Sequence, residues 1–147
     1  MTERTFEYQA SREKIREFAR ATGETNRVHF EVDFARAAGY RDVVAPPMFV
    51  AVYAAPVFRE ALWDPSLAVD RRMTVHGAQE FRWGELVIAG DELVTSVLLR
   101  SDELRGRNRF IVFETKTTNQ NAEFVVGGLW TAAVRSTPIP DAPGPDA

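Results

Sequence analysis

The residues best suited to proton transfer lie in one short segment of the chain, residues 22–29. Glu24 carries a carboxylate, His29 carries an imidazole five residues later, and the amide of Asn26 lies between them. A carboxylate beside an imidazole can share the two proton transfers of one reaction. A tight loop would let both groups point into one cleft, with Asn26 hydrogen-bonding water or a substrate hydroxyl. The alternative is a solvated loop charge and a surface histidine; we favour the acid/base pair because Asn26 and His29 occur together.

The composition excludes several other kinds of chemistry. The 147 residues include no cysteine, which rules out a thiolate nucleophile, cysteine-ligated zinc and iron–sulfur clusters. His29 and His76 are the only two histidines, too few for an all-histidine metal site. We therefore expect a protein that works with no metal and no cofactor.

Charge and hydropathy argue against two classes of partner. Eighteen Lys and Arg against 21 Asp and Glu give a net charge of −3, whereas nucleic-acid binding normally leaves a basic stripe. The longest apolar run, Met48–Phe58, is far shorter than the roughly 20 residues that cross a bilayer. Residues 1–11 lack the apolar region of a secretory signal. We expect no nucleic acid, no membrane and a cytoplasmic location.

The segment before the acid/base candidates is predicted to form a strand and then a helix. Thr5–Tyr8 alternates like a short strand, and Ser11 has the position of a helix N-cap. Apolar residues follow at helical spacing, and the helix should end near Gly23. Residues 22–40 are polar and irregular, so we interpret them as an ordered overhang in which Glu31–Ala38 forms one or two helical turns.

The most apolar segment follows two prolines. Pro46 and Pro47 suit the first turn of a helix, where backbone donors lack partners within the helix. The run Met48–Phe58 is apolar on every face, so this helix should be enclosed by protein. Pro56 removes one backbone hydrogen bond and should kink or end the helix nearby.

The second half of the chain has the pattern of antiparallel strands. The strand-like segments are rich in Val, Thr, Phe, Leu and Trp and are separated by turn residues; they are Met73–Trp83, Glu92–Arg100, Arg109–Thr118 and Phe124–Arg135. About five strands and one wholly apolar helix pack best when a curved sheet wraps the helix. This predicts an α+β hotdog fold in a single domain, residues 1–135. Residues 136–147 hold four of the eight prolines and should be a disordered tail.

The segment Thr22–His29 resembles the hydratase motif of the MaoC-like dehydratase family, Ser/Thr-Gly-Asp-x-Asn-Pro-x-His. Thr22, Gly23, Asn26 and His29 match it, whereas Glu24 replaces the aspartate and Arg27 the proline. Three further segments resemble the N-terminal, FAS1-like dehydratase branch of that family, which includes small actinobacterial (3R)-hydroxyacyl-ACP dehydratase subunits; they are Val44–Phe49, Val75–Gln79 and Ala89–Asp91.

The resemblance implies an (R)-specific 3-hydroxyacyl thioester dehydratase, or enoyl thioester hydratase, acting on acyl-CoA or acyl-ACP. Glu24 and His29 would be the acid/base pair and Asn26 the polar positioner. The thioester oxygen would lie at the start of the apolar helix, formed by Pro47, Met48 and Phe49, where free amides favour negative charge. Because proline has no N–H, the donor would be Met48 or Phe49.

His76 is a further substrate-binding candidate from the same resemblance. It lies in the matching segment Val75–Gln79. The alternative is a packed or hydrogen-bonded structural residue, which is the commoner role for a single histidine inside a strand.

Two other functions stay open. Glu24 in place of aspartate favours a noncatalytic acyl-binding subunit of a heterodimeric hotdog dehydratase. A thioesterase ranks lowest, because many hotdog thioesterases carry a carboxylate on the central helix and Met48–Phe58 has none. In every case the sheet has an open edge, so we expect a homodimer or a heterodimer with a second hotdog subunit.

Overall fold

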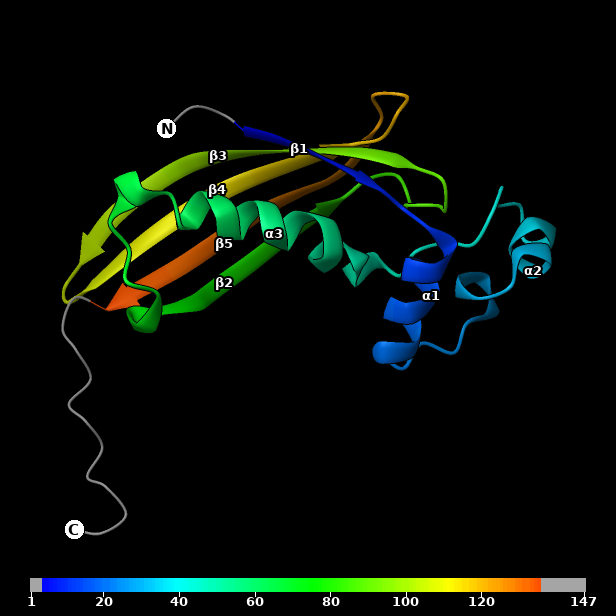
Figure 1. Ribbon diagram of the computed structural model, residues 1–147, viewed down its shortest axis with the longest axis horizontal. Helices are drawn as coiled ribbons and strands as arrows, with labels where there is room; N and C mark the ends of the chain where they lie inside the picture. Colours follow the sequence, from blue (N-terminus) through cyan, green and yellow to red (C-terminus); the bar gives the residue numbers. More distant parts are fainter. Residues whose placement is uncertain (1–3, 136–147) are drawn as a thin grey trace, which may run out of the picture.

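One antiparallel sheet of five strands forms the body of the protein, in the order β1-β3-β4-β5-β2. A computed structural model describes residues 4–135; the tail predicted for residues 136–147 lies outside them. The strands are β1 (Arg4–Gln9), β2 (Thr74–Trp83), β3 (Glu92–Arg105), β4 (Asn108–Thr118) and β5 (Phe124–Arg135). Helix α3 (Val50–Leu62) lies along the concave face of the curved sheet, which confirms the predicted hotdog fold (Figure 1).

The strands match the predicted segments to within one residue at every end except the end of β3. Strand β3 runs five residues beyond the predicted end at Arg100, because Arg105 pairs with Asn108 and leaves only Gly106 and Arg107 in the turn. Gly106 has a φ of 62°, which such a two-residue turn requires. Met73 belongs to a short 3-10 turn instead of β2.

Helix α3 supplies the centre of the core. Its buried side includes Tyr53, Val57 and Phe58, and the Phe58 ring stacks on Trp130 of β5 at 5.3 Å. The prediction that the helix is enclosed on all sides is wrong for the single chain, since Pro56 is exposed and Met48 is 51% exposed. The helix also continues through Pro56 to Leu62 instead of ending there. Because Pro56 is on the exposed side, its ring does not interrupt the buried contacts.

The overhang lies beyond the end of the sheet at which α3 begins (Figure 1). It contains α1 (Arg12–Ala21), the 3-10 turn η1 (Arg27–His29) and α2 (Val32–Ala37), and a second 3-10 turn, η2 (Pro47–Phe49), leads into α3. Two more turns, η3 (Pro65–Leu67) and η4 (Arg71–Met73), connect α3 to β2. Within residues 4–135, no helix is long and apolar enough to cross a membrane.

Candidate active site

The backbone of Glu24 is fixed by the end of α1. The amide of Gly23 donates to the carbonyl of Arg20 at 3.2 Å, and the amide of Glu24 donates to the carbonyl of Ala19 at 2.9 Å. These two bonds form a Schellman motif, which needs a residue in the left-handed region after the helix. Gly23 has a φ of 74° and meets that need without a steric cost. The end of α1 therefore fixes the backbone position from which the side chain of Glu24 extends.

The position of His29 is set by a second cap three residues upstream. The side-chain Oδ1 of Asn26 accepts a hydrogen bond from the amide of Val28 at 3.1 Å and caps η1. The amide of His29 then donates to the carbonyl of Asn26 at 3.1 Å. Asn26 is thus the residue that builds the turn carrying His29. Its predicted contact with the substrate stays a prediction.

The imidazole of His29 is buried and its tautomer is defined. Its Nδ1 lies 2.7 Å from the carbonyl oxygen of Val44, and a carbonyl only accepts, so Nδ1 carries the proton of the neutral ring. Nε2 then holds the free lone pair and lies 4.0 Å from Oε2 of Glu24. This separation exceeds a direct hydrogen bond. One substrate atom placed between the two groups can contact both.

The overhang is joined to the helix entry by hydrogen bonds that hold this geometry. The amide of Val44 donates to the carbonyl of Val28 at 3.0 Å, next to the bond between Val44 and His29. Arg12 of α1 donates two hydrogen bonds to the carboxylate of Asp42, at 2.8 and 2.6 Å. The segment after Asp42 is therefore anchored to α1 on one side and to the histidine turn on the other.

The Arg12–Asp42 pair gives the stability of the overhang a pH dependence. The hydrogen bonds from Arg12 hold the pKa of Asp42 below its ordinary value. A lowered folded pKa adds stability above the ordinary aspartate pKa of about 3.9, and this stability is lost as the pH falls through the folded pKa. Asp42→Asn should therefore melt a few degrees lower than wild type at pH 7, with the difference shrinking below about pH 4. Thermal unfolding from pH 7 to pH 3 measures it.

The control for this prediction is Asp33→Asn, because Asp33 is an exposed aspartate on α2. It should melt like wild type throughout. A difference between Asp42→Asn and wild type that stays constant down to pH 3 would contradict the assigned role of the carboxylate.

Arg27 occupies the position of the motif's proline and contacts Glu31 and Phe34. It donates to the carboxylate of Glu31 at 2.8 and 2.5 Å, and its guanidinium lies 4.5 Å from the ring centre of Phe34. The charge of Arg27 is therefore engaged by Glu31 and α2. The substitution of proline by arginine leaves the Glu24–His29 approach intact.

The helix entry offers one of its two predicted amide donors. The amide of Phe49 donates to the carbonyl of Pro46 at 2.8 Å, so it is already used within η2. Of the two predicted donors, this leaves Met48. The ring of Phe49 is 1% exposed and packs edge-on against Phe18 at 5.6 Å, so it belongs to the core. Pro47 and Met48 are exposed.

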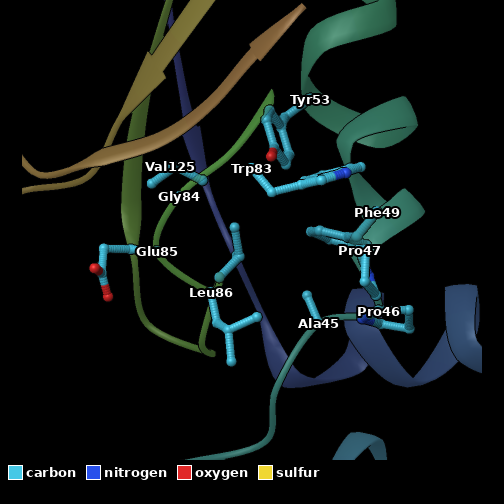
Figure 2. Close-up of a pocket in the computed structure, with 11 residues that line it drawn as sticks. Ala45, Pro46, Pro47, Phe49, Tyr53, Trp83, Gly84, Glu85, Leu86 and Val125 are labelled. Atoms are coloured by element: carbon cyan, nitrogen blue, oxygen red, sulfur yellow. The ribbon is translucent and has the colours of Figure 1, made fainter. Parts of the chain in front are cut away.

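A cavity of about 140 Å³ lies beside this helix entry. The loop after β2 forms one wall and the start of α3 the other, as Figure 2 shows; the lining residues include Ala45, Pro47, Phe49, Tyr53, Trp83, Leu86 and Val125. Ala45 directly follows Val44, the residue that accepts the hydrogen bond of His29. The cavity and the histidine thus share one short segment of backbone.

The sequence pattern did not point to Tyr53 and Trp83 as lining residues. Tyr53 belongs to the apolar run that was predicted to be enclosed by protein, and Trp83 ends a predicted strand. Burial raises the pKa of Tyr53, which keeps its hydroxyl protonated. One signal in the sequence could have indicated Tyr53 as a lining residue: it is the one residue with a hydroxyl group in the apolar run Met48–Phe58.

His76 is not brought together with Glu24 and His29. Its ring stacks on Trp130 at 6.0 Å and lies 5.9 Å from Phe58, in the second half of α3, whereas His29 is held at the segment before α3 begins. Its Nε2 lies 3.1 Å from both the carbonyl of Ala78 and Oε1 of Gln79. This placement fits the structural alternative better than a contact with the reacting atoms.

Comparison with known proteins gives the family. A model of the FAS1-like dehydratase domain region matches residues 2–127. The chain belongs to this family. Among curated FAS1-like relatives, a UPF0336 protein (Lxx02810) of Leifsonia xyli is 38% identical over 128 residues, which cover 87% of this chain and 86% of the relative.

Two solved structures share the fold of the FAS1-like chain. A chain of the HadBC (3R-hydroxyacyl-ACP dehydratase) complex from Mycobacterium tuberculosis is 28% identical, with a TM-score of 0.76 over 90% of this chain and 94% of that one. An (R)-hydratase from A. caviae involved in PHA biosynthesis shares the fold at 17% identity, with a TM-score of 0.69 over 89% and 92% of the two chains.

Proposed function

We propose that the protein is an (R)-specific 3-hydroxyacyl thioester dehydratase, which also catalyses the reverse hydration of a 2-enoyl thioester. The observation that carries this proposal is the approach of Glu24 and His29 to 4.0 Å, with the imidazole held by Val44 so that Nε2 is the free nitrogen. Membership of the FAS1-like dehydratase family supports it. The carboxylate at 40% exposure remains accessible to a substrate, while the histidine at 11% is held in place.

The two side chains would share the protons of the elimination. The member of the pair that holds a proton gives it to the oxygen on C3, and the other member takes the proton from C2. The C3–O bond breaks, the C2–C3 double bond forms and water leaves. The proton has then moved from one member of the pair to the other, so exchange between them or with water restores the starting state.

Negative charge develops on the thioester oxygen as the C2 proton leaves. The amide of Met48 would stabilise it, because the amide of Phe49 is already bonded to Pro46 and Pro47 has none. A donor in this place would polarise the carbonyl in the same step in which His29 or Glu24 acts on C2. Met48 is therefore the one residue of η2 that we propose as the hydrogen-bond donor to the thioester oxygen.

Hydration of a short enoyl thioester tests the proposal directly. The full-length protein is given but-2-enoyl-CoA, but-2-enoyl-ACP or but-2-enoyl pantetheine, and the loss of absorbance of the conjugated double bond is followed. The protein should hydrate at least one of them to the (R)-3-hydroxy product, which chiral chromatography identifies. The (S) product, or no turnover with any carrier, alone or with a partner subunit, would contradict the proposal.

A second candidate function is a noncatalytic acyl-binding subunit. Two observations favour it: the longer Glu24 stands where the family motif has aspartate, and the similar HadBC chain is part of a complex. Such a subunit would bind acyl thioesters without converting them. Turnover that appears only when a chain with the aspartate form of the motif is added, and that survives His29→Ala in this chain, would select this function.

Assembly through the free edge of β2 is expected for either function. Strand β2 pairs only with β5 within residues 4–135, and Val75 on it is 65% exposed. A second hotdog chain would continue the sheet there and cover the exposed face of α3. Val75→Arg should convert a dimer to a monomer in sedimentation analysis, whereas the exposed Leu104→Arg at the β3–β4 turn should not. A wild-type protein that is monomeric alone and gains no mass when a second hotdog chain is added would contradict this edge as the interface.

A further inference from the structure

We infer that the cavity beside η2 is the acyl pocket of this protein and that Trp83 restricts it to acyl groups of about six carbons or fewer. This inference rests on the proposed function, because it names the size of the thioester on which that site acts. The argument depends on the lining of the cavity, the rigidity of its walls, its volume and the position of one indole ring.

The lining suits a hydrocarbon tail. Apart from the hydroxyl of Tyr53, the indole N–H of Trp83 and the backbone, the wall residues that face the cavity are apolar. The one charged residue of the lining, Glu85, turns its carboxylate away from the others (Figure 2). Each methylene moved from water into such a site raises affinity about fourfold. The tail of an acyl thioester held at Met48 therefore has an apolar space beside it.

Backbone hydrogen bonds fix the walls. The amide of Ala45 donates to the carbonyl of Val87 at 2.8 Å, and the amide of Gly84 donates to the carbonyl of Val125 at 2.8 Å. A methyl group on Gly84 would lie 2.3 Å from the carbonyl oxygen of Phe124, so the loop after β2 already packs as closely as a glycine allows. The loop cannot move farther toward β5, and the cavity cannot widen on that side.

The volume sets the size limit. A cavity of about 140 Å³ is smaller than the roughly 300 Å³ at which pockets for drug-sized ligands begin. An apolar cavity of about 150 Å³ engineered in another protein holds one benzene molecule, which has six carbons. A tail of similar size fills the present cavity, and further methylenes would remain outside it.

Trp83 is the wall that a substitution can remove. Its indole extends from the end of β2 toward α3, as Figure 2 shows, and the residue is 47% exposed. Phe49 on the opposite side is 1% exposed and supports the core. Loss of the indole would lengthen the cavity at the end of β2 without emptying the core. Trp83 is therefore the specificity-determining residue of this site.

Binding of saturated acyl pantetheines tests the inference without any turnover, because a saturated chain has no double bond to hydrate. Calorimetric titration with butanoyl, hexanoyl and decanoyl pantetheine should show wild-type affinity rising about fourfold per methylene to hexanoyl and staying level to decanoyl. In Trp83→Ala the rise should continue, with decanoyl bound at least about tenfold more tightly than hexanoyl. Leu104→Ala removes an exposed apolar side chain of β3 that is not part of the cavity lining, and this variant should bind like wild type.

Trp83→Phe guards against a folding defect, since it retains an aromatic wall and should give an intermediate profile. The inference would be overturned if wild-type protein showed the same gain in affinity from hexanoyl to decanoyl pantetheine as Trp83→Ala. It would also be overturned if neither protein bound the acyl pantetheines. Hydration of four- to ten-carbon enoyl thioesters at similar rates would remove the size limit and leave the proposed function. Size-limited binding without hydration of any enoyl thioester would support the size limit and contradict the proposed function.

Discussion

Replacing His29 with alanine should lower the rate of enoyl thioester hydration about 10²- to 10⁴-fold, the range expected when a general acid/base is lost. The imidazole is the one group at the site whose free nitrogen is fixed in direction, because Val44 holds its Nδ1 at 2.7 Å. Alanine removes both that bond and the proton carrier. The loss should appear in kcat, since the group acts on the reacting atoms and not on the acyl tail.

His76→Ala is the matched control for this variant. The two histidines are the only ones in the chain, and His76 stacks on Trp130 and contacts Phe58 instead of approaching Glu24. Its replacement should leave kcat within a few-fold of wild type. A His29→Ala variant that stays fully active, or a His76→Ala variant with the larger loss, would show that the acid/base pair is misassigned.

Glu24→Gln should lower kcat about 10²- to 10³-fold while keeping the shape of the side chain. The amide of glutamine cannot exchange a proton with C2 or with the C3 oxygen. The kcat of Glu24→Asp should lie between that of wild type and that of Glu24→Gln. It keeps the carboxylate but withdraws it, and the Schellman bonds at Gly23 and Glu24 prevent the loop from compensating fully. A misplacement of about 1 Å can cost about a hundredfold.

The exposed Glu31 provides the comparison for Glu24. Glu31 pairs with Arg27 on the outer side of the overhang, so Glu31→Gln removes a carboxylate seven residues away and should preserve kcat. Equal losses in the two variants would indicate that the overhang as a whole had been disturbed. If Glu24→Gln were as active as wild type, Glu24 could not be the acid/base partner of His29.

Periodicity was sufficient to predict most of the fold. The apolar and β-branched residues of Phe124–Arg135, bounded by turn residues, were sufficient to predict both ends of β5, whose buried residues belong to the core and include Trp130 stacked on Phe58 of α3. The polar residues after Arg100 hid the last part of β3, which exists because each of them pairs with a residue of β4. Pro56 does not end α3, since a proline on the exposed side of a packed helix leaves the core contacts of α3 in place; the expected kink stays a prediction.

The spacing of the motif was sufficient to bring Glu24 and His29 together, because both capping signals, Gly23 and Asn26, are local. The remaining features depend on residues distant in the sequence. Val44, 15 residues after His29, determines its tautomer. The cavity wall at Trp83 comes from the end of β2, which lies across the cavity from α3. No local pattern contains that information.

The central claim is that Glu24 and His29 act on the same thioester, and the kinetics of the double variant test it most directly. Residues that act as a unit have strongly non-additive effects on kcat. Glu24→Gln/His29→Ala should therefore hydrate but-2-enoyl thioester no more than about threefold slower than the slower single variant. Losses that multiply, so that the double variant falls by the product of the two single effects, would contradict the account.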